Sequence, residues 1–154
     1  MPDTTQTVDT NTQAERDSIA AEARGKEAEA QVHQNTLDDL REKLARLDEA
    51  YAAVNSVKDS VKDHKTFYFK KCLRYYNEDN RKWVGSTYNN LESEYNGTTL
   101  PSVGTYIGEI DNILDAIGNL RTKYENDILD ETTILSGLWK TINYLWDKWK
   151  NFCN

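Results

Sequence analysis

LDDLREKLARLDEAYAAVNSVKDSV, residues 37 to 61, carries the clearest apolar pattern in this chain. Its large apolar residues recur at steps of 3, 4, 3, 4, 3 and 7, and they are Leu37, Leu40, Leu44, Leu47, Tyr51, Val54 and Val61. Alternating steps of three and four form the heptad seam of a coiled coil, interrupted here only by Lys58. So narrow a stripe needs a partner helix, because a lone helix would leave its leucines in water.

The second half of the chain carries two similar series of apolar residues. The first contains Ile107, Ile110, Leu114, Ile117, Tyr124 and Ile128, and the second contains Leu135, Leu138, Ile142, Leu145, Trp149 and Phe152. Between them, LDETT near residue 130 is expected to kink the helix or to shift the phase of the seam. Because both halves of the chain bear a seam, antiparallel pairing of the two is the simplest way to bury them.

The sequence therefore predicts an all-α protein, built as an elongated antiparallel helical hairpin or coiled coil. We expect one domain over residues 14–152, with long helices at about 14–76 and 105–152. A short helix is expected at about 86–96, because Ser86 or Thr87 can cap its start and Gly97 can end it. The segment GTTLPSVG, residues 97–104, is expected to form a loop.

The first 35 residues carry little apolar surface. Residues 1–13 are polar and rich in threonine, so we expect a disordered N-terminal tail. Residues 14–35 are rich in alanine and glutamate, which are strong helix formers. Since Ile19 and Val32 are the only large apolar residues there, this part is expected to form as an extension of the seam-bearing helix and to fray.

Charge and motifs exclude several classes of function. The formal net charge of −7 disfavours nucleic acid binding, which depends on lysine and arginine. Neither a signal peptide nor an apolar run of about 18 residues is visible, so we expect a protein made in the cytoplasm without a membrane span. No nucleotide-binding, hydrolase or zinc motif occurs, and we expect no enzymatic activity, cofactor or metal.

The two cysteines test the hairpin topology. Cys72 is expected near the tip of the hairpin and Cys153 near its open end. Two cysteines so far apart cannot form an intramolecular disulfide, whose Cα atoms must lie within about 7 Å.

The segment GLWKTINYLWDKWKNF, residues 137 to 152, has a broad apolar face rich in tryptophan. We interpret it as a packing face that also meets a second protein, because aromatic anchors dominate interface energies. The expected partner-binding residues are Leu37, Leu40, Leu44, Leu47, Leu138, Trp139, Ile142, Trp146 and Trp149. The alternative interpretation is a membrane-active helix that lies in the bilayer interface. A self-assembling structural coiled coil is a third hypothesis.

Between the two helical segments stands Trp83-Val84-Gly85. Its simplest role is a turn in which glycine permits the chain reversal and tryptophan covers the end of the helix pair. A long helix containing LREKLARLDEAYAAVNSVKDSV, then Trp-x-Gly, then YIGEIDNILDAIGNLRTKY resembles the WXG/ESX superfamily of type VII secretion. Over residues 37 to 152 it looks most like the YwqH-like branch, small helical proteins of Gram-positive bacteria encoded beside LXG-domain toxins.

This resemblance implies a non-enzymatic targeting factor or chaperone. Its implied partners are the helical domain of an LXG-type effector, a second small helical protein and the type VII machinery. It also implies export without a cleaved signal peptide. The family's Tyr-x-x-x-Asp/Glu export signal would correspond here to Tyr88 and Glu92.

Overall fold

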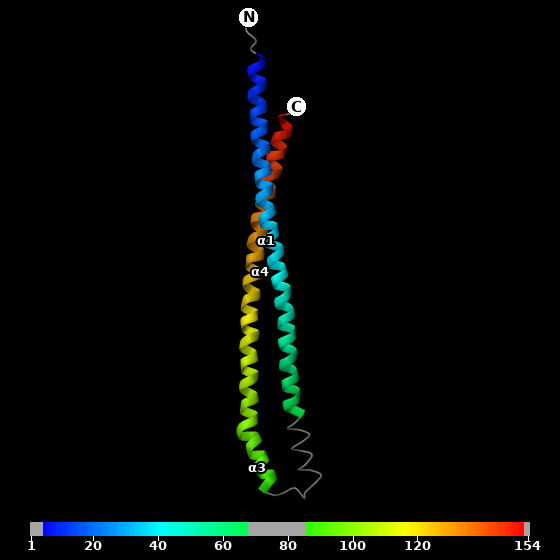
Figure 1. The fold of residues 1–154 in the computed structure, drawn as a ribbon, viewed down its shortest axis with the longest axis vertical. Coiled ribbons are helices and arrows are strands. Elements are labelled where there is room, and N and C mark those ends of the chain that lie inside the picture. The colour runs from blue at the N-terminus through cyan, green and yellow to red at the C-terminus, as the bar shows by residue number, and fades with distance from the viewer. Residues whose placement is uncertain (1–4, 68–85, 153–154) are drawn as a thin grey trace. The chain divides into compact units, whose positions relative to one another are not determined.

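The computed structural model describes residues 5–67 and 86–152 (Figure 1). Residues 5–67 and 86–151 are all helical, and no strand occurs in the described ranges. The elements are α1 Thr5–Phe67, α3 Ser86–Glu94, the π-helix η3 Tyr95–Thr99 and α4 Leu100–Asn151. The prediction of an all-α protein with two long helices is thus confirmed. Trp83, Gly85, Cys72 and Cys153 lie outside the described residues, as does the predicted continuation of the first helix to residue 76.

Helix α1 begins at Thr5, whereas the sequence predicted a disordered tail up to residue 13. Extending an existing helix adds one hydrogen bond per residue and avoids the cost of nucleation, so even threonine-rich sequence can continue it. The part of α1 after residue 13 is also held by packing, since Ile19, Ala23 and Ala30 are buried.

The loop expected at residues 97–104 is helical. In η3 the turn is wider than in an α-helix, and the Leu100 N–H donates to the carbonyl of Tyr95, five residues earlier. Pro101, which has no N–H to donate, is the second residue of α4 and follows directly on this wider turn. Glycine and proline therefore mark a change of helix type here, and the chain stays helical from Ser86 to Asn151.

The chain divides into two compact units, and both long helices contribute to each of them. The terminal unit comprises Met1–Leu44 and Lys123–Asn154, and the central unit comprises Ala45–Thr122. Cross-helix contacts are Glu27–Trp146 and His33–Glu131 in the terminal unit, and Asp48–Arg121 and Lys58–Asp111 in the central unit. Within each unit the α4 residue numbers fall as the α1 numbers rise, so α1 and α4 pack antiparallel (Figure 1).

The seam is longer and more regular than the sequence suggested. On α1, steps of three and four run unbroken from Arg16 to Val61, and Lys58 occupies the expected seam position. On α4, the same steps run from Ile107 to Trp149, with Arg121 and Glu131 at seam positions, and Phe152 continues them just past the end of the helix. The LDETT segment therefore brings no change of phase. Its threonine hydroxyls donate to the carbonyls four residues earlier, as in a regular helix.

The terminal unit has a core in which small residues of α1 face large residues of α4. One cluster joins Ala30 and Leu37 to Leu135, Leu138 and Ile142. A second joins Ile19 and Ala23 to Leu145, with Trp146, Trp149 and Phe152 packed against it. Both alanines are essentially inaccessible to solvent. Because their side chains are small, they leave room for the indole rings on the opposite helix.

No helix among the described residues is both long enough and apolar enough to cross a bilayer.

Candidate functional site

Most residues that the sequence assigned to a partner interface lie in the seam of the chain itself. Leu37, Leu40, Leu138 and Ile142 are buried, while Leu44 and Leu47 are half-buried. The antiparallel helix of the same molecule already covers this surface. A partner could reach these side chains only if α1 and α4 separated, so they are core residues of the folded chain.

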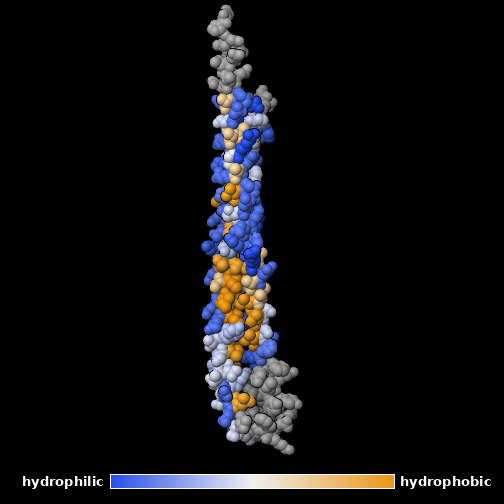
Figure 2. Space-filling view, in the orientation of Figure 1, coloured by the Kyte–Doolittle hydropathy of each residue, from blue (hydrophilic) through white to orange (hydrophobic). Residues whose placement is uncertain are grey.

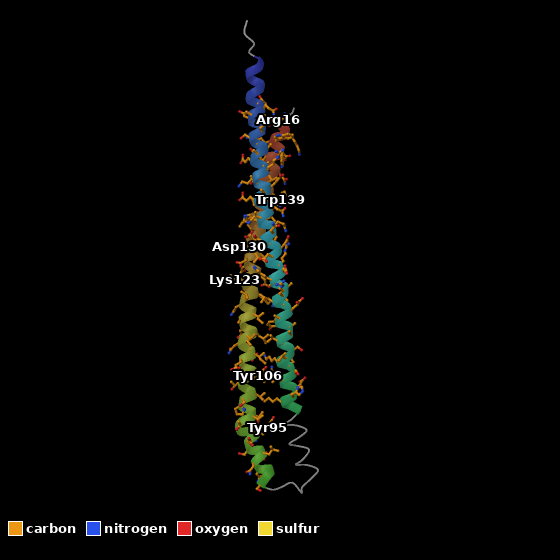
Figure 3. The ribbon with its side chains drawn as sticks, in the orientation of Figure 1. Arg16, Tyr95, Tyr106, Lys123, Asp130 and Trp139 are labelled. Atoms are coloured by element: carbon orange, nitrogen blue, oxygen red, sulfur yellow. The ribbon has the colours of Figure 1, made fainter. Side chains whose placement is uncertain are left out.

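Two of the three tryptophans in α4 are likewise engaged within the terminal unit. Trp146 Nε1 donates to Glu27 Oε1 at 2.8 Å. The Trp146 and Trp149 rings meet edge to face, with 5.8 Å between their centroids. The guanidinium of Arg16, which is labelled in Figure 3, lies 4.9 Å from the centre of the Trp149 ring. These contacts fix both indoles against α1, so the tryptophan face of residues 137–152 is a packing face.

Trp139, which is labelled in Figure 3, is the one member of the predicted partner set that is exposed. Its exposed fraction is 49%. Other exposed apolar residues of this part of α4 are Leu129, Ile134 and Tyr144. Their spacing places them on different faces of the helix, since only residues three, four or seven apart share a face. None of these three residues therefore shares a face with Trp139. The aromatic residue that does is Trp146, seven residues later, and it is partly buried and bonded to α1. Singly exposed apolar side chains are normal on protein surfaces.

Three polar residues of the seam form pairs between the two helices. His33 Nδ1 lies 2.6 Å from Glu131 Oε2, and both side chains are partly buried. Arg121 Nε lies 2.6 Å from Asp48 Oδ1, and its guanidinium also lies 5.9 Å from the centre of the Tyr51 ring. Such pairs form in one alignment of the helices only, so they help to select the antiparallel register.

Lys58 forms the third of these pairs, with Asp111. Its aliphatic stem fills the seam position while its ammonium reaches the carboxylate. This hydrogen bond raises the pKa of the Lys58 ammonium above its usual value. The sequence showed Lys58 only as an interruption, because periodicity of apolar residues cannot reveal a polar residue whose partner lies on another helix.

The central unit exposes a stripe of apolar side chains beside its seam. On α4, Tyr106, Ile113 and Leu120 recur at steps of seven and are all exposed, and Val57 of α1 is exposed as well. Figure 2 shows apolar side chains gathered into one continuous area over this part of the molecule. This stripe was not predicted from the sequence. The signal was present, because its α4 residues are seven apart and each one directly precedes a seam residue, namely Ile107, Leu114 or Arg121.

The predicted export-signal positions belong to α3. Tyr88 and Glu92 lie four residues apart in this helix, and Glu92 is exposed. Within residues 5–67 and 86–152, no three His, Cys, Asp or Glu side chains are grouped so that they could hold a metal ion.

Comparison of the chain with family models, with curated proteins and with solved structures gives no match.

Proposed function

We propose that this protein is a non-enzymatic helical partner that pairs with the helical domain of an LXG-type effector and targets it to type VII secretion. The observation that carries this proposal is the apolar stripe of the central unit, where Val57, Tyr106, Ile113 and Leu120 are exposed. A helix pair that is apolar on its seam and also beside it has the broad face of a bundle helix, which packs on more than one neighbour.

The secretion context comes from the sequence resemblance, and the stripe supports the pairing step. In this mechanism, the hairpin packs its exposed stripe against helices of the effector, so that both partners bury apolar surface. Burial of such surface is favourable by about 25 cal/mol per Å². The combined surface of the two proteins is then what the secretion machinery recognises.

Co-expression tests this proposal. We expect the full-length chain and an LXG-type helical domain encoded by a neighbouring gene to co-elute in size-exclusion chromatography. If each protein elutes alone at its own monomer volume over a range of concentrations, the proposed function is wrong.

The membrane-active alternative gains no support from the terminal unit. Its helix would have to present Leu138, Ile142 and Leu145 to lipid, and these side chains are buried against α1. Insertion would therefore require the loss of both apolar clusters of the terminal unit, and we do not propose it.

A further inference from the structure

The two sides of the central unit differ in chemistry. In the heptad notation a to g, with a and d in the seam, Tyr106, Ile113 and Leu120 are g residues of α4 and Val57 is a g residue of α1. In an antiparallel pair, the g residues of both helices flank the seam on the same side. These four side chains therefore line one side of the helix pair, which we call the g face.

The remaining g and c residues near the middle of this face are small and uncharged. They are Ala50, Ala53 and Ser60 on α1, and Ala116 on α4. Small residues between bulky ones leave grooves into which the side chains of another helix can fit. The opposite side of the same unit is charged instead, because Asp48 and Asp111 occupy its e positions and hold Arg121 and Lys58.

The size of the g face suits a single helix. Val57 is 49% exposed, Tyr106 49%, Ile113 50% and Leu120 38%. These fractions leave roughly 400 Å² of residue surface accessible, about half of the ~800 Å² that each partner contributes to a standard interface. Tyr106 and Leu120 are separated by about 21 Å along α4, the length of about two heptads.

The charges at the border of the g face are mainly acidic. Glu109 is exposed at a c position, and Glu49 and Asp63 are exposed at f positions just outside the c positions. Arg46 is the one basic residue at a c position of the described central unit, and Lys123 is the next c residue beyond that unit. A second copy of the chain would bring identical acidic borders together. A helix with lysine or arginine beside its apolar stripe would meet these carboxylates favourably instead.

We propose that the g face of the central unit binds one amphipathic helix of a different protein, a helix whose apolar stripe is flanked by basic residues. This inference rests on the proposed function, since it names the surface and the kind of helix used in that pairing. The docked helix packs along the groove between α1 and α4 and turns the central unit into a three-helix bundle.

Two synthetic helical peptides of about three heptads test the proposal directly. Both carry the same leucine and alanine stripe, and one has lysine and the other glutamate at the flanking positions. We expect the full-length chain to bind the lysine peptide at least fivefold more tightly in fluorescence anisotropy. Ile113→Gln should weaken that binding about tenfold, because it places a polar amide in the middle of the contact.

Ile134→Gln is the matched control, because Ile134 is also a g residue of α4, is 44% exposed and lies outside the central unit. It should change the affinity less than twofold. Equal effects of the two substitutions, equal binding of the two peptides or no binding would overturn the proposal. A wild-type dimer in sedimentation equilibrium that Ile113→Gln dissociates would also overturn it, since the occupant would then be a second copy.

Co-elution with the LXG-type domain separates this inference from the proposed function. If Ile113→Gln co-elutes with that domain as well as wild type does, the g face is not the docking surface and the proposed function stands. If the lysine peptide binds as expected but the LXG-type domain never co-elutes, the g face stands and the proposed function is wrong.

Discussion

Trp146 and Glu27 are joined across the two long helices by a hydrogen bond in which the indole N–H donates to a carboxylate oxygen at 2.8 Å. The indole also packs against both apolar clusters of the terminal unit. This contact explains how an alanine- and glutamate-rich stretch of α1 can bind a tryptophan-rich stretch of α4. Ala23 and Ala30 are small enough to leave space for the indole rings. Glu27 accepts the hydrogen bond of the Trp146 indole N–H, which is the one polar group of that ring.

Replacing Glu27 with alanine should lower the free energy of unfolding by about 1–2 kcal/mol, because a partly buried indole N–H loses its charged acceptor. Urea denaturation followed by circular dichroism at 222 nm measures this change. Glu22→Ala, at an exposed position of the same helix, is the control and should change stability by less than about 0.5 kcal/mol. Equal midpoints for the two variants would mean that the hydrogen bond does not contribute.

Enlarging Ala30 to leucine should destabilise the protein by about 1–3 kcal/mol, because Ala30 is only 1% exposed and is packed among larger apolar side chains. Ala28→Leu adds the same atoms at an exposed position two residues earlier and should be nearly neutral. Thermal melts of both variants measure the difference. A melting temperature of Ala30→Leu at or above that of Ala28→Leu would contradict the small-to-large packing described for the terminal unit.

Truncating Ile142 to alanine should cost about 2–5 kcal/mol, since only 2% of this residue is exposed and the change leaves a cavity in the core. Ile134→Ala removes the same atoms from a side chain that is 44% exposed, and it should cost far less. Guanidinium denaturation of both variants makes the comparison. A loss of under about 1 kcal/mol for Ile142→Ala would show that this cluster is not a tightly packed core.

The Lys58–Asp111 pair should make stability depend on alkaline pH. Because hydrogen bonding to Asp111 raises the pKa of Lys58, the folded state holds this proton more tightly than the unfolded state. The contribution is complete below the unfolded lysine pKa of about 10.4 and is lost as pH rises through the folded value. Melting temperatures measured from pH 9 to 12 should therefore fall more steeply for wild type than for Lys58→Met.

Lys140→Met is the control for this experiment, because Lys140 is an exposed residue of α4 in the other unit. It should keep the wild-type slope between pH 9 and 12. If Lys58→Met keeps that slope too, the ion pair makes no contribution to the alkaline loss of stability.

Gly25 lies inside α1, and a Cβ atom added there would meet nothing within 4 Å. Gly25→Ala should therefore stabilise the protein by about 0.5–1 kcal/mol, because alanine restricts the unfolded chain and favours the helix. The urea midpoint should rise with an unchanged slope. A lower midpoint would mean that the surface around Gly25 is closed by contacts that need a bare backbone.

The helical class of the protein and its main seam could be predicted from the sequence, because leucines at steps of three and four leave few other ways to bury them. The role of Ala23 and Ala30 could not be predicted in this way. Alanine is common on both exposed and buried helix faces, so its burial depends on which side chains lie opposite. The tryptophans of α4 were predicted to bind a partner protein because their own segment does not show which residues lie opposite them. In the structure, small alanines of α1 lie there and the rings of Trp146 and Trp149 pack against α1.

The apolar pattern of the chain was enough to predict that it is helical and that each long helix has an apolar side, because periodicity is a local property of the backbone. How those sides are used depends on the tertiary structure. It pairs Lys58, Arg121 and His33 with acidic residues of the opposite helix. It also buries Ile142 in the terminal unit and leaves Ile113 exposed in the central unit. The reason is geometric: burial belongs to the space between two helices, and the residues that face each other there are about 100 positions apart in the terminal unit.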